Sequence, residues 1–313
     1  MPKLNGNDNV KCVYGYNVDK ENEAVIYNDE THTYIDKNDG SKYISATTLI
    51  HRYTQPFNAD FWASYKALES LVDPLDFKYV KPRLLASKRW NNAYLEELEV
   101  DEELFNAKKE EILQSYEDKK KVACERGTAI HADMENLFYQ KDPKVIKKYA
   151  GGGLFDVKKG YYKLDIDRGI YPEFLISHKF DDYLKVSGQI DLLIVDGHDI
   201  TIIDYKTNNK IDMDSYFDKT TKKKQTMKYP LVNIPDCNFY HYTLQLSLYA
   251  YLLQQINPKY KIKKLAIVHF DHDGNENEYP CEYLKEDVAK MLMHYRKQNK
   301  VQMELTVDKP IEF

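Results

Sequence analysis

The chain has 313 residues, of which 42% are hydrophobic and 30% are charged. This composition excludes general disorder and provides enough apolar material for one large domain, or for a core with a substantial appendage. The sequence shows neither the run of about 20 apolar residues that a membrane-spanning helix needs nor the apolar stretch of a secretory signal. We therefore expect a cytoplasmic protein that does not interact with a membrane.

The net charge is −5, so a coat of positive charge for nonspecific binding of polyanions is not expected, although a local basic groove can still hold phosphates. The four cysteines are scattered and form no C-x-x-C pair, which argues against a disulfide framework or a zinc site. They are Cys12, Cys124, Cys237 and Cys281. No G-x-x-x-x-G-K-S/T phosphate loop occurs, so we expect no ATP site.

The N-terminal part of the chain begins with short strands and continues with helices. Turn signals divide residues 23 to 44 into short strands. Ser45 is a plausible cap for a helix that follows. Residues 58 to 100 are typical of helices interrupted at Pro74 and Pro82.

The middle of the chain changes from helical to strand-like. Residues 101 to 139 predict a long charged helix, interrupted near Gly127 and Thr128. The three glycines at 151 to 153 indicate a flexible break. Residues 170 to 206 predict three successive strands, separated by turns at Asp181–Asp182 and at 196 to 199.

The C-terminal part predicts a polar loop at residues 208 to 237, a helix at 240 to 255, a strand at 265 to 270 and a helix at 283 to 299. This order of elements favours an α/β fold with a mixed β-sheet flanked by helices. We expect two domains. Residues 1 to 100 would form an N-terminal β-meander with a mainly helical elaboration, and residues 101 to 313 would form the core.

The last two of the three predicted strands contain an unusual pair of acidic residues. A hairpin centred between Gly197 and His198 sets Asp191 directly opposite Asp204, and directly paired residues share one face. Lys206 lies two residues beyond Asp204 and points to the same face. An ion pair between Asp204 and Lys206 at a strand end is the simpler alternative. It does not explain a second carboxylate in strands that are otherwise apolar on both faces.

A divalent cation would offset the repulsion between the two carboxylates of Asp191 and Asp204. Two carboxylates supply the hard oxygen ligands that such a cation prefers, and waters and a substrate phosphate complete the shell. The adjacent Lys206 can orient or deprotonate the attacking water, or offset the charge that develops on the phosphate.

This pattern resembles the PD-(D/E)XK nuclease superfamily and, within it, the RecB-type exonuclease branch. That branch has a Gly-x-x-x-His motif upstream, as at Gly127 to His131, and a Gln-x-x-x-Tyr helix downstream, as at Gln245 to Tyr249. The segment from Tyr43 to Ile50 is similar to that preceding this core in mitochondrial genome-maintenance exonucleases and phage-encoded relatives. The resemblance implies a restriction-endonuclease-like core and, for a phage-encoded protein, the host cytoplasm.

The resemblance also implies roles for individual residues. His131, Asp191 and Asp204 would bind metal, with the backbone carbonyl of Tyr205 as a further ligand. Asp191, Asp204 and Lys206 would be catalytic. Glu135 could orient His131 or be a solvated helix charge.

Glu173 matches an acidic catalytic position of this branch, but its register is open. A two-residue turn at Asp181–Asp182 sets Glu173 opposite Ile190, whereas one extra loop residue or a bulge sets it opposite Asp191.

The resemblance further implies contacts with the substrate. Gln245 and Tyr249 lie one turn apart on the predicted helix and would face nucleic acid near the scissile phosphate. Thr207 directly follows the catalytic lysine. The lysine cluster on the next loop would hold phosphates without reading sequence. It comprises Lys219, Lys222, Lys223 and Lys224.

We therefore expect a metal-dependent deoxyribonuclease that uses Mg²⁺ or Mn²⁺, acting as an exonuclease on DNA ends or single strands. The alternatives are a catalytically silent nucleic-acid-binding protein on the same fold, and a structure-specific or restriction-type endonuclease. DNA is the expected partner, and recombination or replication proteins are further candidates. Because Cys237 and Cys281 are far apart and no C-terminal cysteine cluster exists, we expect no iron–sulfur cluster.

Overall fold

The structure is a computed structural model. It describes residues 10–12, 14–16, 25–28, 31–36, 39–141, 155–156, 161–162, 166, 168–218 and 222–307. The chain forms two compact units. The first comprises residues 1–54, 130–217 and 224–313, and the second comprises residues 55–129 and 218–223.

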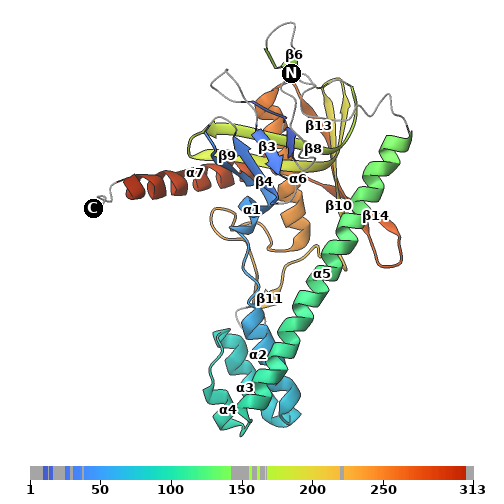
Figure 1. Cartoon of the computed structure of the whole chain (residues 1–313). Coiled ribbons are helices and arrows are strands. Elements are labelled where there is room, and N and C mark those ends of the chain that lie inside the picture. The colour runs from blue at the N-terminus through green and yellow to red at the C-terminus, as the bar shows by residue number, and fades with distance from the viewer. Residues whose placement is uncertain are drawn as a thin grey trace. The chain divides into compact units, whose positions relative to one another are not determined.

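The first unit is built on a large mixed sheet (Figure 1). Its strands are β1 (Val10–Cys12), β2 (Tyr14–Tyr16), β3 (Val25–Asn28), β4 (Thr33–Asp36), β5 (Lys42–Ser45), β8 (Gly169–Asp181), β9 (Leu184–Asp196), β10 (Asp199–Lys206), β13 (Lys261–Phe270) and β14 (Glu276–Cys281). The main path runs β1-β3-β4-β5-β9-β10-β13-β14. Strand β8 pairs with β9 and with β2.

The central strands run in both directions. Strands β8, β9 and β10 form an antiparallel meander, as the sequence predicts. Strand β10 pairs with β13 in parallel, and β5 pairs with β9 in parallel. Strand β9 is buried along most of its length, which accounts for its apolar residues on both faces.

Helices cover the sheet on both faces. The main core contains residues of α1 (Ala46–His51), α6 (Asn238–Ile256) and α7 (Lys285–Val307), together with one face of the central strands. Ile130 and Met134, in the last turns of α5 (Glu102–Lys141), pack against a second cluster formed by Leu192, Tyr205 and Phe270. The α/β class with a restriction-endonuclease-like arrangement is confirmed.

The second unit is helical. It contains α2 (Ala59–Leu71), α3 (Pro74–Ser87), α4 (Ala93–Glu97) and the part of α5 up to Ala129. The side chains of Asn58 and Asp73 cap α2 and α3 by accepting backbone N–H groups. The core of the unit is rich in aromatic rings, and Trp90 stacks on Phe105 with a centroid separation of 4.7 Å. The expected helical elaboration is confirmed.

The helices differ from the predictions at several places. Helix α7 ends at Val307, beyond the predicted end at residue 299. Pro82 lies inside α3 and does not end it, whereas Pro74 occupies the first turn, where its missing N–H costs nothing. The interruption predicted near Gly127 and Thr128 is wrong, because α5 is one continuous helix of 40 residues. Ser45 caps α1 as predicted, by accepting the amide of Thr48 at 3.2 Å.

The sheet is also larger than predicted. Strand β14 was missed, because its exposed sequence lacks an apolar pattern. The N-terminal strands join the same sheet as β9. The boundary expected between residues 100 and 101 falls inside the second unit, and the division at that point remains a prediction.

Four further two-residue strands form two small hairpins, β6 (Phe155–Asp156) with β7 (Tyr161–Tyr162) and β11 (Phe217–Asp218) with β12 (Lys223–Lys224). The glycines at 151 to 153 and Lys219 lie outside the described residues. Within the part of the chain that the structure describes, every helix is too short or too polar to span a lipid bilayer.

Candidate active site

The β9–β10 hairpin has the predicted register. Ile203 pairs with Leu192, and the pairing ends there. The next residues along the two strands are Asp204 and Asp191. Beyond the last pair, the amide of Tyr205 donates to Oδ2 of Asp191 at 2.7 Å. The Asp191 carboxylate thus takes the place of a backbone acceptor at the point where the two strands separate.

Glu173 lies opposite Asp191. Pro172 pairs with Leu192 and Phe174 pairs with Ile190, which leaves Glu173 facing Asp191 between them. An irregularity between Lys179 and Asp181 shifts the register by one residue near the β8–β9 turn. The turn lies at residues 182 and 183, one residue later than predicted. Of the two registers left open by the sequence, the structure has the one that sets Glu173 opposite Asp191. The φ of Glu173 is +50°, in the left-handed region that residues other than glycine rarely adopt.

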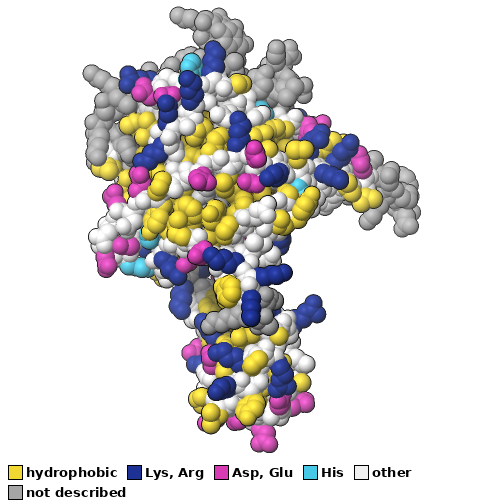
Figure 2. Space-filling model, turned by 180° about the vertical axis from the view of Figure 1, so that it is seen from behind, with side chains coloured by type: hydrophobic (Ala, Val, Ile, Leu, Met, Phe, Trp, Pro, Cys, Tyr) yellow, Lys and Arg dark blue, Asp and Glu magenta, His cyan; other side chains and the backbone are white. Residues whose placement is uncertain are grey.

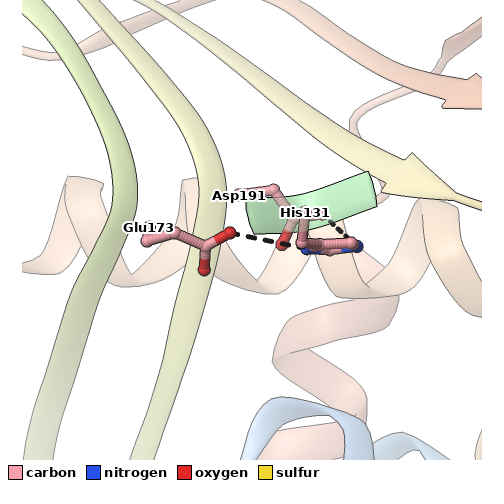
Figure 3. Close-up of side chains that lie close together, drawn as sticks. All are labelled: His131, Glu173 and Asp191. Carbon is pink, nitrogen blue, oxygen red and sulfur yellow. Dashed lines mark ion pairs between the residues drawn. The ribbon is translucent and has the colours of Figure 1, made fainter. Parts of the chain in front are cut away.

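His131 of α5 contacts both of these acids (Figure 3). Its Nδ1 is 3.4 Å from Oε1 of Glu173, and its Nε2 is 3.7 Å from Oδ2 of Asp191. One ligand atom from each of the three residues lies within 4.8 Å of the others. Glu173 also accepts a hydrogen bond from the side-chain amide of Gln189. Glu173 and Asp191 are therefore the groups that orient His131.

The charges in this cluster depend on one another. Burial lowers the pKa of His131, but the hydrogen bond to Glu173 and the charges of Asp191 and Glu173 outweigh burial and raise the pKa to about 9. Burial raises the pKa of Asp191, and the charge of His131 opposes this. In this structure the imidazolium supplies the positive charge that two close carboxylates need.

Asp204 and Lys206 form a second group beside Asp191. Nζ of Lys206 makes an ion pair with Oδ2 of Asp204 and lies 4.7 Å from the centre of the Tyr242 ring. Burial raises the pKa of Asp204 to about 7, although Lys206 acts in the opposite direction. Burial lowers the pKa of Lys206, but the charges of Asp204 and Asp191 outweigh it and raise this pKa above its ordinary value. Lys206 is therefore a cation at neutral pH.

A side chain of α6 holds Asp204 by a hydrogen bond. Gln245 donates from Nε2 to Oδ1 of Asp204 at 3.1 Å and to the hydroxyl of Tyr249 at 3.2 Å. Both side chains are buried, with 7% of Gln245 and 3% of Tyr249 exposed. In the structure this pair supports Asp204, and its expected contact with substrate remains a prediction.

Tyr242 is the residue that sequence reasoning missed. It lies three residues before Gln245 and seven before Tyr249, which is the spacing of one helix stripe. Unlike those two side chains it is only half-buried. The stripe spacing was the available signal, but a tyrosine in such a position is more often part of a core.

The remaining predicted residues do not belong to the cluster of His131, Glu173 and Asp191. Tyr205 contributes its amide to Asp191, as described above. Thr207 directly follows β10 and is half-buried. Lys224 pairs with Asp214, at 2.5 Å. Lys222 and Lys223 are exposed and belong to the second unit. Their roles remain predictions.

Comparison with known proteins identifies the family. The chain belongs to the PD-(D/E)XK nuclease superfamily, whose family model matches residues 66–307. No curated protein matches the chain. Among solved structures, the crystal structure of SSO0001 is 14% identical, covers 86% of this chain and 87% of its own, and has a TM-score of 0.31.

Nucleases of this superfamily use divalent metal ions, and the site fits one. His131, Glu173 and Asp191 offer one nitrogen and two oxygen donors within 4.8 Å of one another. Two of these groups are carboxylates held close together, and two such charges need a nearby cation. Carboxylate oxygens together with an imidazole nitrogen are donors that suit a divalent metal ion.

Proposed function

We propose that this protein is a metal-dependent deoxyribonuclease that hydrolyses phosphodiester bonds, and that it acts as an exonuclease on DNA ends or single strands. The observation that carries the proposal is the position of Asp191. It touches the His131–Glu173 group on one side and, through the Tyr205 amide, the segment carrying Asp204 and Lys206 on the other. The similarity to the RecB-type branch supports the exonuclease activity.

The metal would be held by His131, Glu173 and Asp191, and Asp204 and the carbonyl of Tyr205 are the further ligands that the family resemblance implies. Bound Mg²⁺ or Mn²⁺ would supply Lewis acidity toward the phosphate and acidify water. The nitrogen donor of His131 makes Mn²⁺ as suitable as Mg²⁺.

Lys206 has three donors and no acceptor when it is charged. Because Asp204 and the Tyr242 ring hold its ammonium group, we assign to it the orientation of water and the neutralisation of charge on the phosphate, not proton abstraction. Gln245 and Tyr249 would position Asp204. Thr207 and the lysines at 222 to 224 would contact the DNA backbone.

The test is digestion of end-labelled single- and double-stranded DNA with Mg²⁺ or Mn²⁺, with product length resolved on a gel. Asp191→Asn and Lys206→Ala should each abolish cleavage and leave the far-ultraviolet circular dichroism spectrum unchanged. Asp196→Asn is the matched control, because Asp196 lies at the exposed end of the same strand and pairs with Arg168. Cleavage retained in either site variant, or metal-independent cleavage by the wild type, would contradict the proposal.

A closed circular substrate separates the exonuclease from an endonuclease. An exonuclease should degrade the linear form and leave the circle intact. Nicking of the circle at a comparable rate would favour the restriction-type alternative.

A further inference from the structure

A second binding surface lies along α7 in the first unit. The surface is an open groove of about 920 Å³. We call it the α7 groove, and it is lined by Arg52, Tyr229, Pro230, Lys290, Met293, His294, Lys297, Gln298, Asn299, Val301, Gln302 and Leu305. None of the residues assigned above to the active site lines it. Figure 2 shows apolar, basic and acidic side chains along α7.

The groove exposes large side chains that a folded protein normally buries. Tyr229 is 69% exposed, Met293 is 71% exposed and Leu305 is 66% exposed. Met293, Lys297, Val301 and Leu305 are spaced four residues apart, so they form one stripe along the helix. A contiguous exposed surface of this kind marks a binding site.

The charge of the groove is opposite to that of the whole chain. Arg52, Lys290 and Lys297 line the groove, and of the described residues that line it none is acidic. The chain as a whole carries −5. Lys290 pairs with Asp287 at 3.0 Å, so Arg52 and Lys297 carry most of the charge. Cations concentrated on one surface of an acidic protein favour an anionic ligand.

The groove also contains an aromatic platform. The rings of Tyr229 and His294 meet edge to face, with a centroid separation of 5.2 Å. His294 is fixed in turn by the hydroxyl of Tyr53, 3.1 Å from its Nδ1. An exposed, supported tyrosine ring beside cations is the arrangement on which unpaired bases stack while phosphates are neutralised.

The groove and the active site belong to the same compact unit. Arg52, which lines the groove, directly follows α1, and α1 packs against α6. Helix α6 carries Tyr242, whose ring lies 4.7 Å from Nζ of Lys206. The same pair of packed helices therefore borders the groove and the active site.

We propose that the α7 groove binds a single-stranded segment of the DNA substrate away from the scissile phosphate. Arg52 and Lys297 contact the backbone of this segment, and a base stacks on Tyr229. This inference rests on the proposed function for the identity of the ligand. It assigns to α7 a role in holding substrate that the active-site cluster does not provide.

The test measures binding without cleavage. Fluorescein-labelled oligothymidylates of 6 and 30 nucleotides are titrated with the full chain in EDTA, and fluorescence anisotropy is followed at several salt concentrations. Lys297→Gln and Tyr229→Ala should each weaken binding of the 30-mer by about tenfold and leave binding of the 6-mer unchanged. Lys297→Gln should also lower the salt dependence by about 0.7 in the logarithmic slope, which corresponds to one phosphate contact.

Lys300→Gln is the matched control. Lys300 lies on the same helix, is half exposed, pairs with Glu304 and does not line the groove. It should bind both oligonucleotides as the wild type does. Equal binding of the 30-mer by the wild type and both groove variants would overturn the proposal. An equal loss for the 6-mer would also overturn it, because the groove would then not be a separate surface.

The alternative ligand of the groove is a second copy of this chain. If Met293→Ser or Leu305→Ser changes the sedimentation coefficient of the free protein while DNA binding is unaffected, the groove is an interface between copies and the proposal is wrong. Because binding is measured in EDTA, its result is independent of cleavage. Digestion of the 30-mer by the wild type with Mg²⁺ tests the proposed function by itself.

Discussion

Gly188 of β9 is required by the position of Tyr249. A Cβ atom added at Gly188 would lie 2.3 Å from Cε1 and 3.2 Å from Cζ of the Tyr249 ring. Ordinary contact between carbon atoms is about 3.5 to 4.0 Å, so the ring would have to move by more than about 1 Å. Tyr249 is only 3% exposed, so its ring is enclosed by the protein.

We therefore expect Gly188→Ala to lower the free energy of unfolding by about 3 kcal/mol, the upper end of the usual cost of overpacking a core. The displaced Tyr249 hydroxyl would also leave Gln245, which holds Asp204. Cleavage should therefore decrease as well, even under conditions in which the variant is fully folded.

The assay is urea denaturation followed by circular dichroism, in the wild type and in a Tyr249→Leu background. Leucine removes the ring, so the added methyl group no longer meets Cε1. In that background the cost of Gly188→Ala should vanish or reverse, since alanine is favoured over glycine within a strand by roughly 0.5 to 1 kcal/mol. The same cost in both backgrounds would refute the reasoning.

Two further predictions concern a buried histidine and the aromatic neighbour of Lys206. Burial lowers the pKa of His178 to about 4 from 6.5. Protonation therefore favours the unfolded state, and stability should decrease by about 3 kcal/mol as the pH falls from 6.5 to 4. The urea midpoint of His178→Leu should depend less on pH in that window, and an unchanged dependence would contradict the prediction. Tyr242→Phe should retain single-turnover cleavage, whereas Tyr242→Leu should lose about tenfold because the cation–π contact with Lys206 is lost. An equal loss in both variants would point to the hydroxyl instead of the ring.

Site residues could be placed from the sequence where the length of a turn determines which residues of two strands pair. A short hairpin turn after Asp196 determines which residues of β9 and β10 face each other, so Asp191 and Asp204 could be placed by register alone. The position of Glu173 could not be fixed in this way, because it depends on a one-residue irregularity near Phe180. A bulge has no reliable signature in a single sequence.

The helices were harder to place for a different reason. Gly127 has a low intrinsic preference for helix, yet α5 continues through it, because the helix-forming residues of the neighbouring turns outweigh one glycine. The full burial of Tyr249 and the partial burial of Tyr242 on the same stripe depend on how deeply α6 sits against β9. Only the tertiary structure, with Gly188 opposite the Tyr249 ring, determines that depth.

The register between β9 and β10 determines both the hairpin and the geometry of the site, and Asp191 is the residue that links the two. Its carboxylate accepts the amide of Tyr205, the residue between Asp204 and Lys206, and also faces His131. One side chain therefore fixes the distance between the two halves of the site through the backbone of β10, which is more rigid than a contact between two long side chains. A slip of one residue between β9 and β10 would turn Asp191 to the opposite face. It would separate the halves and at the same time leave the Tyr205 amide without this acceptor, so the register that stabilises the hairpin is the one that assembles the site.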